Sequence, residues 1–349
     1  MMKKSVALLA TLVMFVGTDI SVAAPKVHLR MATTVSSPHV WYLGAEYFAK
    51  RVAELSNNEI EVSIHGGGSV GNENAIANGL RLGSLDMMIL SFTPLASLVP
   101  EGAVFCIPYI FTGYDHNARV MKTGSPVFNL MQKYVERRNV GFKVLATAGG
   151  GARCYLNTLR PIVTPEDMKD MKIRTVTNSM TKKIWETVGA VPMAVSATEA
   201  YSAMQTGVCN AIEASLALFN SARLCEIAKY LSLSRHEFVV TNISISDLAM
   251  RRLSKEHYAV VKKVAEETGE FVTKTGIEND SKLVDLMVQK DALKVNEIDK
   301  DAFIKLFTPL QNELAENLAG TKDGLELLNA IRDMASEEKS ENMSVGQNK

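Results

Sequence analysis

The chain has 349 residues, and its 38 lysines and arginines balance 38 aspartates and glutamates, so the formal net charge is zero. A balanced charge produces no extended basic field. Nucleic acid is therefore a poor candidate partner, although local basic residues can still bind a small anion. The length is too great for one ordinary core and is enough for two domains of roughly 150 residues each.

The N-terminal residues have the pattern of an export signal. Lys3 and Lys4 precede the apolar run 6–16, and small residues follow at 21–24. This order of basic, apolar and small residues predicts a signal peptide over 1–23. The apolar run is shorter than the roughly 20 residues needed to span a bilayer. No cysteine lies near the expected cleavage site, which argues against a lipoprotein. We therefore expect a periplasmic protein.

The mature part alternates short strands with amphipathic helices. This alternation favours an α/β fold built on largely parallel sheet. Pro309 is expected to break or kink its helix, and the polar tail 336–349 is expected to be disordered. Strands are predicted at 27–32, 59–64, 85–90, 141–148, 155–161, 172–176 and 208–214, and helices near 38–52, 73–82, 116–138, 178–188, 198–207, 254–286, 299–318 and 324–334.

Two glycine-rich segments interrupt this alternation. Gly66, Gly68 and Gly71 match the GxGxxG pattern between a predicted strand and a predicted helix. We interpret them as a chain-reversing turn, because an exported protein is not expected to meet a nicotinamide cofactor. The triple glycine at 149–151 is the clearest break in the first half, and we place a crossing between domains there.

Enzyme signatures are largely missing from the sequence. It contains no GxSxG, HExxH or P-loop pattern, and its six histidines lie far apart. We therefore expect a protein that is not an enzyme and that uses no cofactor and no metal.

The four cysteines are Cys106, Cys154, Cys209 and Cys225. Their spacing fits no zinc template. An even number in an oxidising compartment permits two disulfides, whereas apolar neighbours are equally compatible with buried free thiols. The sequence leaves the pairing open.

Two arginines are candidates for anion binding. Arg153 enters a predicted strand just after the triple glycine, and Arg174 lies in a predicted strand among apolar residues. Strand ends line the ligand crevice of α/β proteins, where a guanidinium presents a two-pronged donor to a carboxylate. The alternative is that both are solvated or paired with structural acids such as Asp167 or Glu213.

Four segments resemble the solute-binding proteins of TRAP transporters (DctP-type). They are RPIVTPEDMKDMKIR at 160–174, VGAVPMAVSATEAYSAMQTG at 188–207, GLRLGSLDM at 79–87 and FCIPYIF at 105–111. The resemblance covers nearly all of the mature chain, in order.

The resemblance implies a periplasmic binding protein with two α/β domains, an interdomain ligand cleft, crossing hinge strands and a long helix that spans both domains. We expect domain I to contain 24–150 and about 239–278, and domain II to contain 151–238 and about 279–335. The family's Lys-Ile-Arg element places the carboxylate-binding arginine at Arg174. Arg153 matches a second family arginine that supports or shares this contact.

The function implied is a receptor that delivers a small organic acid to the membrane subunits of a TRAP permease. A ligand sensor with the same fold that feeds a signalling protein is the alternative. The sequence departs from the family at Asn210-Ala211, where Asp-Gly is usual, and at Ala214, where Asn often follows Glu213. Because alanine cannot make the polar contact of that Asn, we do not expect sialic acid as the ligand.

Further ligand-binding candidates come from the elements near the expected cleft. Glu73 opens a helix, where the helix dipole alone also favours an acid. Asn178 either donates to a hydroxyl or caps its helix. With these two as hydroxyl partners, a hydroxylated or sugar-acid-like monocarboxylate is slightly favoured. The predicted ligand-binding residues are Arg174, Arg153, Glu73, Asn178, Trp41, His39, Ser91 and Glu213.

Overall fold

The computed structural model describes residues 27–176, 178–316 and 322–346, with the side chains of 179 and 336–346 left undescribed. The predicted signal peptide lies outside these residues. In the described part of the chain, no helix is long and apolar enough to cross a membrane.

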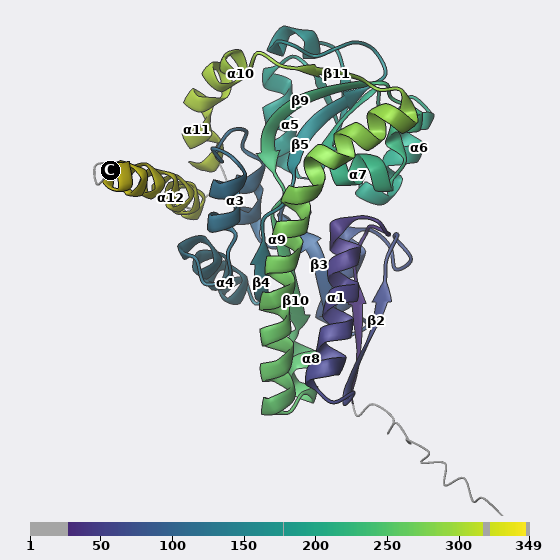
Figure 1. Cartoon of the computed structure of the whole chain (residues 1–349), viewed down its shortest axis with the longest axis vertical. Helices are drawn as coiled ribbons and strands as arrows, with labels where there is room; N and C mark the ends of the chain where they lie inside the picture. Colours follow the sequence, from purple (N-terminus) through teal and green to yellow (C-terminus); the bar gives the residue numbers. More distant parts are fainter. Residues whose placement is uncertain (1–26, 177, 317–321, 347–349) are drawn as a thin grey trace, which may run out of the picture.

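The strands form two separate sheets (Figure 1). One is five-stranded, in the order β2-β1-β3-β10-β4, and the other is six-stranded, in the order β11-β9-β5-β8-β6-β7. The strands are β1 Val27–Ala32, β2 Ile60–His65, β3 Met87–Ser91, β4 Phe142–Ala148, β5 Ala152–Asn157, β6 Lys172–Thr175, β7 Val191–Ala194, β8 Ala211–Ser215, β9 Tyr230–Phe238, β10 Thr241–Ser246 and β11 Lys294–Glu297.

Helices cover the sheets and complete two lobes. The first lobe is the five-stranded sheet with α1 to α4 and α8, and the second is the six-stranded sheet with α5 to α7 and α10. The helices are α1 Val40–Leu55, α2 Glu73–Leu82, α3 Tyr114–Val120, α4 Pro126–Arg138, α5 Ser179–Thr187, α6 Ala200–Gln205, α7 Leu216–Ser221, α8 Asp247–Arg252, α9 Lys255–Asp291, α10 Lys300–Phe307, α11 Gln311–Glu316 and α12 Asp323–Gly346.

The chain crosses between the lobes on two neighbouring strand connections. β4 belongs to the first sheet and β5 to the second, with the triple glycine at 149–151 between them. β9 and β10 make the return crossing, and Val239 N donates to Gly151 O at 3.0 Å between the two connections. The sheets are mixed rather than largely parallel as predicted, because β5 and β10 pair antiparallel with both of their neighbours.

The long helix α9 runs along both lobes (Figure 1). It packs against α1 and β4 of the first lobe and against α7 of the second. Its carboxylate at Asp280 accepts hydrogen bonds from Ala152 N at 2.6 Å and from Tyr114 Oη at 2.8 Å. The helix is thereby fastened to the start of β5 as well as to α3.

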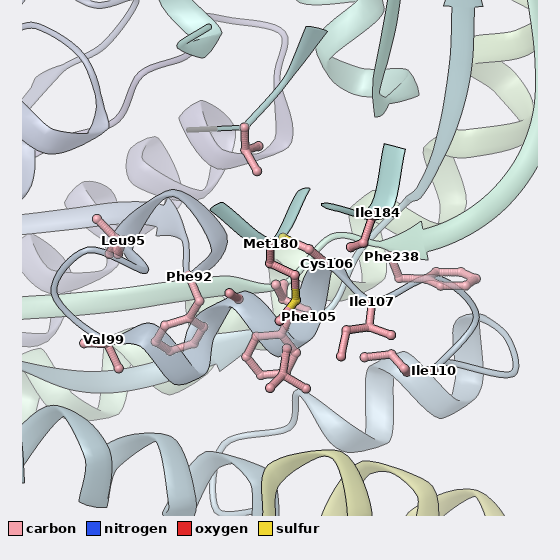
Figure 2. Close-up of a cluster of buried hydrophobic side chains, with 14 of the residues drawn as sticks. Phe92, Leu95, Val99, Phe105, Cys106, Ile107, Ile110, Met180, Ile184 and Phe238 are labelled. Carbon is pink, nitrogen blue, oxygen red and sulfur yellow. The ribbon is translucent and has the colours of Figure 1, made fainter. Parts of the chain in front are cut away.

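The hydrophobic core is continuous from one lobe to the other on one side of the molecule. Figure 2 shows Met180 and Ile184 of α5 beside Cys106 and Ile107, which close the 3-10 helix Pro100–Cys106. Phe238, at the end of β9, belongs to the same cluster. This apolar contact holds the lobes together along that side.

Several predicted elements have the expected bounds because their capping residues are local. Asn72 accepts a hydrogen bond from Ala75 N at the start of α2, and Gly83 ends the helix with a φ of 75°. The kink predicted at Pro309 is confirmed, since a 3-10 turn, Thr308–Leu310, separates α10 from α11.

Other predictions require correction. The helix predicted over 116–138 is two helices, because Gly124 has a φ of 87° and Ser125 with Pro126 begins a new helix. The backbone is helical to Gly346 where disorder was predicted, since the segment from Asp323 is rich in helix formers. Residues 347–349 of that tail lie outside the described chain. α12 packs on α3, α4 and the 3-10 helix Pro100–Cys106 of the first lobe.

Candidate ligand site in the interlobe cleft

A cavity of about 50 Å³ lies between the two lobes. Its wall is formed by the loops and element ends of both lobes and by the crossing connection after β9. The lining residues are Val35, His39, Trp41, Glu73, Ser91, Thr93 and Pro94 from the first lobe, Arg153, Arg174, Val176, Ala197, Ser215, Leu218 and Glu237 from the second, and Val239 and Val240 from the crossing.

Arg174 is buried at this wall with an incompletely satisfied guanidinium. It lies on β6, is 2% exposed, and its Nε donates to Val195 O at 2.8 Å. Among the described residues it forms no ion pair with an acidic side chain. Burial lowers the pKa of Arg174 below its usual value, against the opposing field of Glu213. A buried cation without a carboxylate partner is unfavourable by itself, which makes this position a candidate site for an anion.

Arg153 lines the same cavity and is mostly buried, but it already has acidic partners. Its Nη2 and Nε lie 2.6 and 2.8 Å from Glu213 Oε2, and its Nε lies 3.4 Å from Glu237 Oε1. Burial alone would lower the pKa of Arg153, but the two carboxylates outweigh burial and raise it. Arg153 is therefore paired with Glu213, which is the alternative to ligand binding that the sequence left open.

The partners of Arg153 are set by the register of three strands. Arg153 on β5 lies opposite Ser215 on β8 and Glu237 on β9. An irregularity in the β5–β9 pairing follows, in which Arg235 has a φ of 42°. This irregularity directs His236 inward, where its Nε2 lies 3.8 Å from Glu213 Oε2.

Glu213, His236 and Glu237 have the donor atoms of a metal site. Their ligand atoms lie within 4.8 Å of one another. The guanidinium of Arg153, however, contacts both carboxylates at 2.6 to 3.4 Å, so a cation there would have to displace it. We therefore interpret this cluster as the support of Arg153.

His39 and Trp41 lie at the start of α1. The His39 ring accepts the Trp41 backbone N–H at Nδ1, 3.1 Å away, and so caps the helix. Burial lowers the pKa of His39 to about 3, which keeps the ring neutral. The Trp41 indole N–H donates to Thr241 Oγ1 at 2.8 Å.

Two predicted residues make contacts between the lobes. Glu73, at the start of α2, accepts a hydrogen bond from Ala197 N of the second lobe at 3.3 Å. The Asn178 amide donates to Thr93 O at 3.2 Å and to Cys106 Sγ at 3.3 Å, and its oxygen caps α5 by accepting from Thr181 N. Both contacts hold the lobes in the closed arrangement.

The structure thus gathers six of the eight predicted residues on one wall. Arg174, Arg153, Glu73, Trp41, His39 and Ser91 line the cavity, whereas Asn178 and Glu213 do not. Asn178 is turned toward Thr93, and Glu213 stands behind Arg153. Sequence reasoning missed Glu237, whose only local signal is its place just before the crossing.

The glycine-rich turn and the cysteines have structural roles. Gly68 and Gly71 have φ values of 76° and 100°, and a Cβ at Gly68 would collide with Thr198 of the second lobe, which fits the interpretation as a chain-reversing turn. All four cysteines are buried free thiols, which decides the alternative left open by the sequence.

Proteins of similar sequence support this architecture. Residues 31–317 match the model of the bacterial extracellular solute-binding protein family 7. An uncharacterised protein y4mM of Sinorhizobium fredii is 32% identical over 264 residues, 75% of this chain and 48% of that protein, so the chain spans about half of its length. The 2,3-diketo-L-gulonate-binding periplasmic protein YiaO of Escherichia coli is 26% identical over 277 residues, 79% of this chain and 83% of that protein.

A solved structure has the same fold. The TRAP periplasmic solute-binding protein from Sulfitobacter sp. NAS-14.1 with bound β-D-galacturonate superposes with a TM-score of 0.80 at 25% identity, covering 88% of this chain and 99% of that one. The family model spans most of the sequence, and the structure has two lobes with a cleft between them, as in the TRAP periplasmic solute-binding protein. This chain therefore belongs to the bacterial extracellular solute-binding protein family 7.

Proposed function

We propose that this protein is a periplasmic receptor that captures a small organic carboxylate through Arg174 and delivers it to the membrane subunits of a TRAP-type transporter. The observation that carries the proposal is the buried guanidinium of Arg174, which faces the interlobe cavity without an acidic partner among the described residues. The likeness to a receptor that binds galacturonate supports a carboxylate as the ligand.

On binding, the ligand carboxylate exchanges its contacts with water for an ion pair with Arg174. Hydrogen bonds to a charged group contribute about 1.5–3 kcal/mol each, and a guanidinium can form two of them with one carboxylate. A closed cleft lowers the local dielectric and strengthens the pair. Arg153, held by Glu213 and Glu237, adds a fixed positive charge beside it.

Closure couples binding to recognition by the transporter. Glu73 of the first lobe and Ala197 of the second both line the cavity, and they are joined by a hydrogen bond. A ligand that contacts both lobes binds the closed form better than the open form. It shifts the equilibrium by its differential affinity for the two. The membrane subunits can then distinguish a loaded receptor by its shape.

The proposal is tested by replacing Arg174. We expect Arg174→Ala to weaken carboxylate binding by roughly 3–5 kcal/mol, because the ligand's charge is then buried without a partner. Arg174→Lys should also bind poorly, since an ammonium cannot reproduce the planar fork. A thermal-shift screen over organic acids finds the ligand, and calorimetry measures its affinity.

Arg251→Ala is the matched control, because Arg251 is an exposed arginine of α8 away from the cavity. It should bind like the wild type. Near-native affinity of Arg174→Ala would contradict the assignment of the carboxylate site.

A further inference from the structure

A row of three side chains crosses the six-stranded sheet where the sheet borders the cavity. Arg153 of β5 lies opposite Ser215 of β8 on one side and opposite Glu237 of β9 on the other. Directly opposed residues of antiparallel strands project to the same face of a sheet, and all three residues line the cavity. The register of the strands therefore presents the Glu237 carboxyl group to a ligand.

The Glu237 carboxyl group is buried and has hydrogen-bonding capacity to spare. Its Oε1 lies 3.4 Å from Arg153 Nε, whereas Glu213 Oε2 lies 2.8 Å from the same Nε and 2.6 Å from Nη2. No other described residue donates a hydrogen bond to this carboxyl group. Glu213 therefore neutralises most of the charge of Arg153, and Glu237 is left without a close cation of its own.

The balance of charge around the cavity disfavours an ionised Glu237 once an anion is bound. Among the described residues, the wall and the space directly behind it contain two guanidinium groups, Arg153 and Arg174, and three carboxyl groups, Glu73, Glu213 and Glu237. A ligand carboxylate adds a fourth negative charge to these three. Excess charge is costly in a closed cleft of low dielectric, and a proton on one of the glutamates reduces the excess.

Glu237 is the carboxyl group best placed to carry that proton. Burial raises the pKa of Glu237 to about 8, against the effect of Arg153 and together with that of Glu213. Burial would also raise the pKa of Glu213, but Arg153 and His236 outweigh burial and lower it. The third carboxyl group, Glu73, accepts a backbone N–H from the other lobe.

The other titratable groups around Glu237 bring no competing charge. Cys106 closes the 3-10 helix that packs against β9, and burial raises the pKa of its thiol well above the usual value. His236 precedes Glu237 on β9, and burial lowers the pKa of its ring. Both groups are therefore neutral at pH 7, and Arg153 is the cation that Glu237 contacts.

We propose that Glu237 binds the ligand as a neutral carboxylic acid that donates its proton to a ligand oxygen, so that the anion is bound together with this proton. The inference rests on the proposed function and adds to it a ligand-binding residue and a dependence on pH. A neutral carboxylic acid is a donor as well as an acceptor, whereas a carboxylate only accepts. Protonated Glu237 can therefore serve either a carboxylate oxygen or a hydroxyl of the ligand.

The direction of the pH dependence follows from where the proton is held. Below about pH 8 the empty receptor already carries the proton on Glu237, and the affinity should not change with pH. At higher pH the proton must be taken from solvent on binding, so the affinity should fall by up to about 10-fold per pH unit.

Calorimetry on the purified protein tests this proton uptake. The probes are D-galacturonate, L-galactonate, D-erythronate and pantoate, which are fully ionised above about pH 6; if none of them binds, the tightest ligand of the thermal-shift screen replaces them. The binding enthalpies in buffers of different ionisation enthalpy give the number of protons taken up. We expect uptake near zero at about pH 6.5 and close to one at about pH 9.5, where the affinity should be about 10- to 30-fold weaker than at pH 7.

Glu237→Gln removes the titration but keeps a side chain of similar shape that can donate. It should take up no proton, and its affinity should be constant between about pH 7 and about pH 9.5. Glu46→Gln is the matched control, because Glu46 is an exposed glutamate of α1 that does not line the cavity. It should keep the pH dependence of the wild type.

Two results would overturn this inference and leave the proposed function standing. One is wild-type binding that is lost in Arg174→Ala but shows neither proton uptake nor weaker affinity at high pH. The other is a pH dependence that persists in Glu237→Gln, since another group would then carry the proton. Absence of binding by the four probes and by every acid of the screen would overturn both the inference and the proposed function.

Discussion

Two arginines that line the same cavity have different electrostatic surroundings. Arg153 is 12% exposed and is held by Glu213 and Glu237, whereas Arg174 has a backbone carbonyl as its hydrogen-bond partner. The first is neutralised by its own fold, whereas the second has no acidic partner among the described residues. Both occupy strands of the same sheet, so the difference lies in their neighbours.

This contrast predicts effects of different size on the stability of the two variants without ligand. Arg153→Ala leaves the Glu213 carboxylate buried without its cation, and we expect the free energy of unfolding to fall by about 3–5 kcal/mol. Arg174→Ala removes one hydrogen bond of about 1 kcal/mol and also removes an unpaired buried charge, so the change should stay within about 1 kcal/mol. Urea denaturation measures both. Equal losses for the two variants would contradict the distinction.

The pKa of Glu237 predicts that the free energy of unfolding depends on pH. Burial raises its pKa from 4.5 to about 8, and Glu213 adds to this while Arg153 opposes it. Between pH 4.5 and about pH 8, Glu237 keeps its proton in the folded state but has released it in the unfolded chain. The free energy of unfolding therefore contains a contribution from Glu237 that falls as the pH rises through this window.

Glu237→Gln should remove that contribution, because the amide is neutral at every pH. The stability of the variant relative to the wild type should increase from about pH 5 to about pH 8 in urea denaturation. A constant difference across this range would show that Glu237 does not titrate there.

At the scale of elements, helix α9 depends on two glycines, Gly269 and Gly276. The helix is continuous through both. A Cβ at Gly269 would lie 2.6 Å from Thr147 O of β4, and a Cβ at Gly276 would lie 3.1 Å from the Gly150 Cα at the crossing. The glycines therefore allow α9 to lie against the backbone of the crossing chain.

We expect Gly269→Ala to lower the free energy of unfolding by about 1–3 kcal/mol through overpacking. Helix propensity alone predicts the opposite effect, because it favours alanine over glycine by about 1 kcal/mol. Ser281→Ala, at an exposed position of the same helix, should be neutral or slightly stabilising. Urea denaturation compares them, and a Gly269→Ala variant as stable as the wild type would exclude the close contact.

At the scale of the whole molecule, the closed arrangement depends on contacts that join the lobes across the cleft. The Asn178 amide to Thr93 O and the Glu73 carboxylate to Ala197 N are two of them. Asn178 has a second role as the N-cap of α5. A substitution that separates the two roles therefore tests closure alone.

Asn178→Asp retains the capping oxygen, since Asp and Asn cap helices about equally well, but it loses the amide donor. We expect stability to change little and affinity for the ligand to fall about 2- to 10-fold, as for one lost hydrogen bond. Small-angle scattering should also show a more open receptor without ligand. Affinity equal to that of the wild type would mean that this contact does not favour the closed form.

The sequence by itself determined what short segments encode. The caps at Asn72 and Gly83 defined α2, the strand and helix alternation defined the α/β class, and the Lys-Ile-Arg element identified Arg174 as a site candidate. Only the tertiary structure decided which arginine is paired, because Arg153, Glu213 and Glu237 come from three different strands. It also turned Asn178 toward Thr93 and brought Arg174 into one cavity with residues of the other lobe. Such neighbours depend on strand register and lobe closure, which join residues far apart in the chain and leave no local pattern.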